Sequence, residues 1–393
     1  MSRQEILIVG CSIAGPRSSN FCVQGQNVDV RAVGVTVIRT LDLETAVRAS
    51  HTGEIGTKWV DKKNRVWASF AVDPSGKLQT PTSDIEIMRG RLSKLCWERS
   101  QYVSEKVKAE GGAGVDYIFG DYIQELEQDG DKVHVKLAKS GAKHTFDLIV
   151  GVDGLQSSTR KLVWGIEGEE ERIFRLGVYG AFFSMPRGEK DDTWCRWYHA
   201  PGGLGVMLRL DMQRNKTTPF MTIMNDKDER FPKVAETMTR IEACKRIVEG
   251  MMETDDFYYD LIAQVRMDKW SRGRVVLVRD AGYCASPFSG AGTALAIGGA
   301  WNLAGALTRH LDNLEAAFAE YEETMRPLAN SAQKLPPGIP RAFHPKTRFG
   351  VWALNSVMAF LYWSGIFNLL FKLAGPTANS LPLGKYEFER LPE

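Results

Sequence analysis

Residues 274–293 read RVVLVRDAGYCASPFSGAGT, and this stretch decides the fold that we expect. Its apolar run at 275–278 is typical of a strand buried in a parallel sheet. Asp280 follows the strand, and the glycine-rich run 290–293 opens an alanine-rich helix expected to continue through Leu307. A carboxylate at a strand end accepts hydrogen bonds from polyol hydroxyls, and backbone amides at a helix start attract anionic or electron-rich groups. Either half alone is a common turn, but the two at this spacing predict a ligand site.

Two other strand ends carry similar signals. The apolar run Ile6–Val9 leads into the turn 10–15, which is the dinucleotide fingerprint GxGxxG with its middle glycine replaced by Ser12. Small residues there let the backbone approach a pyrophosphate at a helix N-terminus, although a turn without a ligand reads similarly. The apolar run 146–152 leads into Asp153-Gly154 and a helix expected at 157–163. The alternative here is a plain Asp-Gly turn that caps the helix.

The rest of the chain predicts a mixture of helices and strands. Apolar residues at helical spacing predict a helix over 89–109, and short strands are expected at 117–119 and 133–137. The alternating, aromatic-rich segment 173–223 predicts a sheet, and 234–252 reads as an amphipathic helix.

The predicted fold class is therefore α/β with an α+β insert. We expect a Rossmann-like dinucleotide-binding domain at 1–165 and 265–330, interrupted by a β-sheet substrate domain at 166–264. A helical extension is expected at 331–393.

Composition and charge exclude several classes of function. The chain has 50 basic and 48 acidic residues, a net charge of +2, and no basic stripe, which argues against nucleic-acid binding. Its six cysteines are scattered, with no Cys-x-x-Cys pair and no histidine at ligand spacing, so we expect reduced thiols and no metal site. No signal peptide is visible at the N-terminus, which predicts a cytoplasmic protein.

One segment, 351–374, is apolar enough to raise the question of a membrane. It is interrupted by Asn355, Ser356, Ser364, Asn368 and Lys372, whereas a spanning helix needs about 20 largely uninterrupted apolar residues. A packed C-terminal helix or helical hairpin is the favoured interpretation, and an interfacial anchor with peripheral membrane contact is the alternative.

Four separated motifs occur in a family-specific order: GCSIAGP at 10–16, EIMRGRL at 86–92, DG with a later Ser and Arg at 153–160, and DAGYCASP followed by GxGT at 280–293. Over residues 1–16 and 25–310 the chain resembles the para-hydroxybenzoate hydroxylase-like (group A) flavin monooxygenases. The most similar subgroup is the FAD aromatic hydroxylases, which also include tetracycline-inactivating enzymes.

The resemblance implies FAD as the cofactor and NAD(P)H as a transient co-substrate. It implies that NAD(P)H reduces the flavin, that O2 is captured as a C4a-hydroperoxide, and that one oxygen atom passes to an aromatic or polyketide-like small molecule of secondary metabolism. The protein would act as a monomer or homodimer. The FAD-contacting residues that the resemblance implies are Gly10, Ser12, Ala14, Gly15, Arg31, Arg89, Asp153, Gly154, Asp280, Pro287, Gly290, Gly292 and Thr293.

Two departures from the family pattern bear on activity. Only nine residues separate Gly15 from Gly25, too few for the first helix, the second strand and the acidic ribose ligand of a dinucleotide-binding unit. Either 27–30 forms a makeshift second strand with Asp29 as ribose ligand, or the element is absent, which we favour. In addition, Arg279 stands where the family usually has glycine, and it either crowds the cofactor or adds a phosphate partner. The short unit keeps two alternatives open: an inactive flavoprotein relative that binds a ligand or partner, and a flavin-dependent reductase.

Candidate substrate residues lie in the aromatic-rich segment. Tyr198 or His199 would orient or deprotonate a phenol, and Arg209 would bind an anionic substrate group. The alternative is that the aromatic residues pack the sheet and Arg209 lies on a solvated face. Pro287 and Phe288 are expected to form a pocket wall near the flavin.

Overall fold

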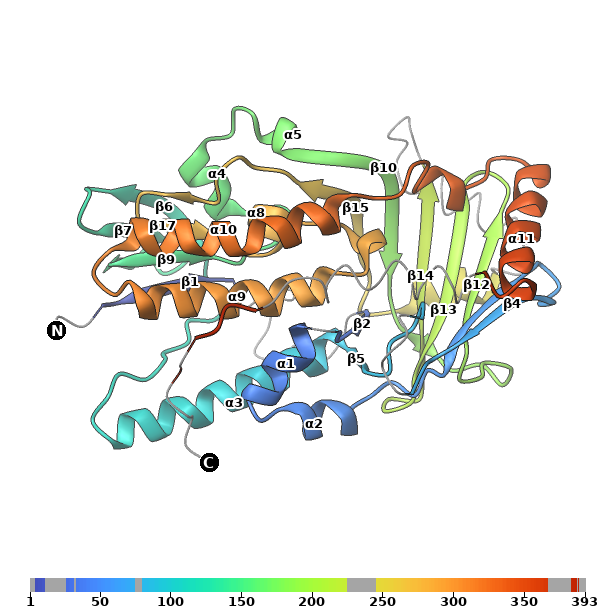
Figure 1. The fold of residues 1–393 in the computed structure, drawn as a ribbon, viewed down its shortest axis with the longest axis horizontal. Coiled ribbons are helices and arrows are strands. Elements are labelled where there is room, and N and C mark those ends of the chain that lie inside the picture. The colour runs from blue at the N-terminus through green and yellow to red at the C-terminus, as the bar shows by residue number, and fades with distance from the viewer. Residues whose placement is uncertain are drawn as a thin grey trace.

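The computed structural model describes residues 4–10, 26–31, 33–74, 80–224, 245–366, 383–386 and 388 (Figure 1). Three parallel strands and one antiparallel strand form the first sheet, in the order β1-β9-β17-β16. Their bounds are β1 Ile6–Val9, β9 Leu148–Gly151, β17 Val275–Leu277 and β16 Ser271–Arg272. The three parallel strands are the three apolar runs that precede the glycine and aspartate motifs, so the α/β prediction is confirmed.

Two different layers cover this sheet. Leu148 and Val276 belong to the cluster formed with helices α9 (Gly292–Arg309) and α10 (Leu314–Gln333), which lie side by side along the sheet (Figure 1). Alternate residues such as Ile149 and Val275 instead pack against a three-stranded sheet. That sheet consists of β6 (Ile123–Gln128), β7 (Val133–Leu137) and β8 (Lys143–Phe146). The strand expected at 133–137 is confirmed, whereas the strand expected at 117–119 is wrong, because those residues are irregular and the strand begins at Ile123.

In the part of the chain that the structure describes, strand β1 is covered on one face only. Leu7 and Val9 pack against the three-stranded sheet, but Ile6 and Ile8, on the face that α9 and α10 share, are 42% and 63% exposed. Among the described residues, β1 pairs with β9 alone. A dinucleotide-binding unit places its first helix and second strand beside β1. The exposed isoleucines are the surface that such elements would cover.

Strand β2 (Asn27–Asp29) does not replace the second parallel strand. It pairs in antiparallel fashion with β5 (Glu86–Met88), in a two-stranded sheet of its own. The makeshift-strand interpretation is therefore wrong, which leaves the absence of the element as the account we keep; residues 11–25 lie outside the described part of the chain. The small sheet packs with three helices in a cluster that reaches Ile297 of α9. These helices are α1 (Val33–Thr40), α2 (Glu44–Ala49) and α3 (Arg89–Ala109).

The largest sheet has eight strands, with seven in the order β15-β10-β14-β13-β12-β3-β4 and β11 paired to β14. Their bounds are β15 Tyr258–Val265, β10 Ile173–Phe182, β14 Lys216–Met224, β13 Leu204–Asp211, β12 Cys195–Ala200, β3 Gly56–Val60, β4 Val66–Ala71 and β11 Met185–Pro186. The sheet expected within 173–223 is present. Strands β3 and β4 extend it from a part of the chain that we had expected to belong to the dinucleotide-binding domain.

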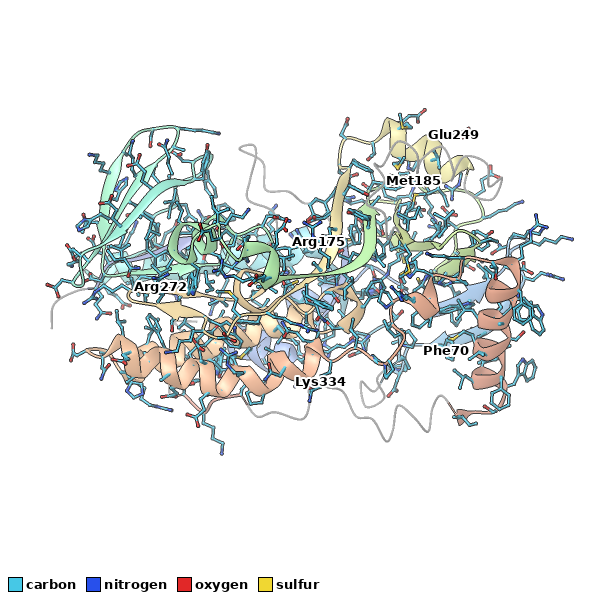
Figure 2. The ribbon with its side chains drawn as sticks, turned by 90° about the horizontal axis from the view of Figure 1, so that it is seen from above. Phe70, Arg175, Met185, Glu249, Arg272 and Lys334 are labelled. Carbon is cyan, nitrogen blue, oxygen red and sulfur yellow. The ribbon has the colours of Figure 1, made fainter. Side chains whose placement is uncertain are left out.

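Helices cover both faces of the large sheet. Helix α7 (Lys245–Glu253) packs on one face near Met185, and α11 (Arg348–Trp363) packs on the other near Phe70 (Figure 2). Helix α7 coincides with the second half of the helix expected at 234–252 and ends one residue later, while 234–244 lies outside the described residues. The remaining helical segments are α4 (Ser158–Trp164), α5 (Glu169–Arg172), α8 (Asp280–Tyr283) and the 3-10 turns Pro287–Ser289 and Arg341–Phe343.

Candidate functional site

Gly10, Asp153 and Asp280 follow the ends of β1, β9 and β17, which are parallel neighbours. They therefore lie at the same edge of the sheet, where α/β proteins bind their ligands. Gly10 has a φ of 95°, and a Cβ added there would lie 2.9 Å from the Cα of Asp153. Only glycine permits this close approach between the first two strand ends.

Asp153 is held by the start of α4. One carboxylate oxygen accepts a hydrogen bond from Ser157 Oγ at 2.5 Å, and the other accepts from the backbone amide of Thr159 at 2.8 Å. Asp153 therefore does cap helix α4, which was the alternative to ligand binding in the sequence analysis. Gly154, at a φ of 82° and with open space around it, leaves its backbone accessible next to this turn.

Arg160 is a residue whose role the sequence did not reveal. It is fully buried, pairs with Glu169, and donates to the carbonyl oxygens of Leu155 and Ala281 at 2.7 Å each. Arg160 therefore ties the Asp153-Gly154 turn to the loop that follows Asp280. The signal in the sequence for such a contact is an arginine that follows the Asp153-Gly154 turn by a few residues.

The loop from Arg279 to Gly290 has two non-glycine residues in conformations that favour glycine. Arg279 has φ 63° and ψ −135°, and Ser286 has φ 72° and ψ 159°. Such strain is concentrated at functional sites. Beyond the loop, Gly290 and Gly292 have no atom within 4 Å of an added Cβ, so the backbone at the start of α9 is open. Open amides at this helix start, beside the strand-end carboxylate Asp280, fit the flavin half of FAD.

Two arginines were expected to contact FAD elsewhere. Arg31 follows β2 and donates to Asp29 Oδ2 at 2.7 Å and to the Thr80 carbonyl at 3.0 Å. Asp29 is therefore engaged by Arg31, which argues against a role as ribose ligand. Arg89 begins α3, next to β5. Ser12, Ala14 and Gly15 lie outside the described residues.

Tyr258, the first residue of β15, lies within electrostatic reach of Arg89 and Asp280. Its phenol donates to Asp260 Oδ2 at 2.7 Å. Burial raises the pKa of Tyr258 above its ordinary value, with smaller effects of opposite sign from Asp280 and Arg89. Arg89 and Asp280 are therefore both within electrostatic reach of this phenol. The sequence did not point to Tyr258.

A second part of the site is a face of the large sheet. His199 in β12 pairs with Gly205 in β13, and Gly205 pairs with Thr222 in β14, so the three form one row. Thr222 Oγ1 lies 2.9 Å from Nε2 of His344, whose ring stands edge-on to Phe288 at 5.9 Å. The face that carries His199 is thus connected to the glycine-rich loop through His344 and Phe288. Pro287 is exposed beside Phe288.

His199 is 2% exposed, and its ring stacks on Trp59 with 4.7 Å between ring centroids. Neither of its ring nitrogens has a hydrogen-bond partner in the described part of the chain. Burial, with a smaller contribution from His344, lowers its pKa to about 3. The imidazole is therefore neutral at physiological pH and suited to hydrogen bonding, not to proton abstraction.

Tyr198 lies on the other side of the sheet. Since successive side chains of a strand alternate, Tyr198 points away from the face that carries His199. It packs with the cluster that contains Val206 and Val248, beneath α7. Tyr198 and His199 therefore do not act on the same ligand.

Arg209 lies on the same face of the large sheet as His199, but its guanidinium is paired with two carboxylates. Its Nε lies 2.9 Å from Glu54 Oε2, and its Nη2 lies 2.7 Å from Glu86 Oε2. Burial raises the pKa of Glu86 well above its ordinary value, and Arg209 opposes that shift. An arginine held between two carboxylates has no charge left for an anionic substrate group. We therefore assign Arg209 to a buried ion cluster and do not carry it forward as a substrate ligand.

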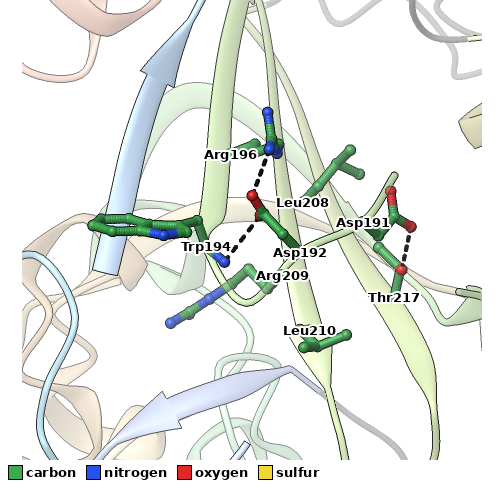
Figure 3. Close-up of a pocket in the computed structure, with 8 residues that line it drawn as sticks. All are labelled: Asp191, Asp192, Trp194, Arg196, Leu208, Arg209, Leu210 and Thr217. Atoms are coloured by element: carbon green, nitrogen blue, oxygen red, sulfur yellow. Dashed lines mark hydrogen bonds and ion pairs between the residues drawn. The ribbon is translucent and has the colours of Figure 1, made fainter. Parts of the chain in front are cut away.

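A small cavity lies beside Arg209 (Figure 3). Its walls are fixed by polar contacts, among them Arg196 with Asp192 at 2.6 Å and Thr217 with Asp191 at 2.6 Å. About 10 Å³ is open to the centre of a water molecule, which is room for about one water. An aromatic substrate does not fit there. No group of three or more histidine, cysteine, aspartate or glutamate residues in the described ranges is arranged to hold a metal ion.

Comparisons with known proteins agree with this geometry. Residues 97–334 match the family described as FAD binding domain. The chain is 32% identical to FAD-dependent monooxygenase asL6 of Sarocladium schorii, over 98% of this chain and 99% of that protein, and 33% identical to monooxygenase CTB7 of Cercospora beticola, over 88% and 85%. The alignment with asL6 spans 423 positions, so at least 30 positions have no counterpart among the 393 residues of this chain.

Solved structures share the fold. Tetracycline destructase Tet(51) superposes with a TM-score of 0.71 at 25% identity, over 98% of this chain and 99% of that one. HpxO of Klebsiella pneumoniae, solved with FAD and uric acid, superposes with a TM-score of 0.70 at 18% identity, over 97% and 98%.

Proposed function

The chain belongs to the FAD-dependent monooxygenases, and we propose that it uses NAD(P)H and O2 to hydroxylate an aromatic or polyketide-like small molecule. The observation that carries the substrate site is the buried, unpartnered imidazole of His199 on the sheet face next to Phe288. A buried polar group without a partner is costly, by about 1–3 kcal/mol. A substrate hydroxyl at His199 would remove that cost.

The cofactor is expected to lie along the edge formed by Gly10, Gly154 and Asp280. The chemistry that FAD supplies when bound is the uptake of electrons from NAD(P)H and the activation of O2. The amides at the start of α9 would hold the electron-rich edge of the ring, and Asp280 would accept hydrogen bonds from the polyol chain. Arg31 and Arg89 would add positive charge along the same molecule.

The substrate would lie between the flavin and the row His199–Gly205–Thr222. Phe288 and Phe220 both pack against the cluster of Val178, Met224 and Ile262, and they would form apolar walls. Because the pKa of His199 is lowered to about 3, the ring is a hydrogen-bonding partner that orients a phenol or enol and does not remove its proton. Burial of His199 also keeps water from competing for the same hydrogen bond.

The test is oxygen incorporation by the FAD-loaded protein. NADPH or NADH, ¹⁸O₂ and a panel of phenolic and polyketide-like compounds are supplied, and products are identified by mass spectrometry. We expect one ¹⁸O atom per product molecule. NAD(P)H oxidation without any oxygenated product, across the panel, would contradict hydroxylation and favour a flavin-dependent reductase.

A separate variant tests the proposed role of His199. His199→Phe keeps an aromatic ring against Trp59 but removes both nitrogens, so kcat/KM should fall by about 10- to 100-fold while the bound FAD is unchanged. His134→Phe is the matched control, since His134 is exposed on β7 and is expected to leave kcat/KM unchanged. Equal kcat/KM in wild type and His199→Phe would rule out the assigned substrate contact.

A further inference from the structure

The outer face of α11 carries a stripe of large aromatic side chains. Phe349, Trp352, Phe360 and Trp363 are 73%, 55%, 62% and 82% exposed. At 100° per residue these four positions fall within one narrow sector of the helix, and the stripe extends over roughly 21 Å. Phe349 and Trp352 already contact each other, with 5.6 Å between ring centroids.

The opposite face of α11 packs against the large sheet. Met358 and Leu354 pack on Trp59 and Phe70 of the large sheet, and Asn355 accepts a hydrogen bond from Trp59 Nε1 at 3.1 Å. A helix that is apolar on all sides is normally buried on all sides. Here one side is covered by the sheet, whereas nothing among the described residues covers the aromatic side.

The segment of sequence that carries the stripe has charges of one sign only. From Thr324 to Tyr386 the sequence contains no aspartate or glutamate, while seven lysine or arginine residues occur there. Three of these, Arg341, Lys346 and Arg348, are exposed immediately before the aromatic stripe. After α11 ends at Trp363, the sequence continues through residues 364–366 into another apolar run, FNLLF at 367–371, which is followed by Lys372. An aromatic stripe bordered by basic residues matches the chemistry of an anionic lipid surface.

We propose that α11 docks this protein on an anionic membrane surface, with the aromatic stripe in the lipid interface and the basic residues at the headgroups. The helix would lie on the membrane and not cross it, since no helix in the described ranges is long and apolar enough to span a bilayer. A second copy of the chain fits less well. A stripe about 21 Å long and about 10 Å wide offers roughly 200 Å², whereas a stable dimer buries about 800 Å² on each partner.

Flotation of the purified, FAD-supplemented full chain with lipid vesicles tests the proposal. Wild type should float with vesicles of phosphatidylcholine and phosphatidylserine, more weakly with phosphatidylcholine alone, and less at high salt. The double variant Phe360→Ser/Trp363→Ser should reduce the partition coefficient by about tenfold or more. Both side chains are exposed, so the variant should keep the thermal unfolding midpoint of wild type.

A matched control removes equally exposed apolar side chains elsewhere. Ile166 and Met252 are 79% and 76% exposed, away from α11, so Ile166→Ser/Met252→Ser should float like wild type. No flotation of wild type with either vesicle would overturn the proposal, as would equal flotation of wild type and Phe360→Ser/Trp363→Ser. A dimer in analytical ultracentrifugation that this double variant abolishes, without vesicle binding, would assign the stripe to a second copy instead.

Discussion

His199 and Arg209 lie on the same face of the large sheet, roughly 13 Å apart along it, and burial affects the two in opposite ways. Arg209 keeps its charge because Glu54 and Glu86 surround it. His199 has no such partner, so burial holds the ring neutral. The difference separates a charged residue that is paired within the fold from a neutral one whose ring nitrogens have no partner among the described residues.

Acid should destabilise the protein partly through His199. Its pKa is lowered from 6.5 to about 3 in the folded protein, so between these values only the unfolded chain takes up the proton. The stability is fully present above pH 6.5 and is lost as the pH falls toward 3, at about 1.4 kcal/mol per pH unit. Urea unfolding of His199→Phe across this range should show a shallower decline than wild type. Parallel curves for the two proteins would show that His199 does not carry this dependence.

Arg279 stores backbone strain at the cofactor loop. At φ 63° and ψ −135° glycine is favoured, so Arg279→Gly should raise the free energy of unfolding by about 1 kcal/mol. Thermal unfolding measures this. Asn64→Gly is the control, because Asn64 also has a positive φ, 60°, but asparagine tolerates it and little change is expected. A loss of stability in Arg279→Gly would mean that contacts of the arginine side chain outweigh its strain.

The small sheet of β2 and β5 is attached to the large sheet by the buried ion cluster. Glu86 in β5 accepts hydrogen bonds from Asn27 in β2 and from Thr52, and faces Arg209 in β13. Arg31, expected to contact FAD, directly follows this strand pair. The cluster therefore fixes the segment that we propose to bind the cofactor against the sheet that we propose to bind the substrate.

Two variants of this ion cluster should differ widely in their free energy of unfolding. Glu86→Gln should cost less than Arg209→Met, because burial raises the pKa of Glu86 and so already opposes its charged form. Arg209→Met should cost about 3–5 kcal/mol, since it leaves buried carboxylates without a cation. Urea unfolding measures both. The contribution of Glu86 is present below its ordinary pKa of 4.5 and is lost as the pH rises toward the folded value, so Glu86→Gln should remove that decline. An equal loss of unfolding free energy in the two variants would contradict this account of the charges.

The strands and helices around the site show how much of the fold could be predicted from the sequence. The apolar runs before Gly10, Asp153 and Asp280 are strongly patterned, and these strands were predicted within a few residues. The helix over 89–109 agrees with α3 at both ends. The partners of Arg209 were not predictable, since Glu54 and Glu86 are more than 120 positions away and only the packing of β5 against β13 brings them together. The direction of Tyr198 depends on the pairing register of β12, which periodicity alone does not fix.

At the scale of the whole molecule, the fold and the family agree, and the open question concerns the start of the chain. Ile6 and Ile8 of β1 are exposed where a dinucleotide-binding unit places its first helix and second strand. At least 30 positions of asL6 have no counterpart in this chain. The described residues fit the flavin half of FAD better than its adenosine half.

The amount of FAD that the purified chain holds tests this account most directly. After incubation with FAD and removal of the excess by gel filtration, absorbance of the flavin and of the protein gives the molar ratio. We predict a yellow protein with about one FAD per chain, because the strand-end edge and the start of α9 supply the flavin contacts. A colourless protein that retains no FAD would contradict the assignment of this chain as a working monooxygenase.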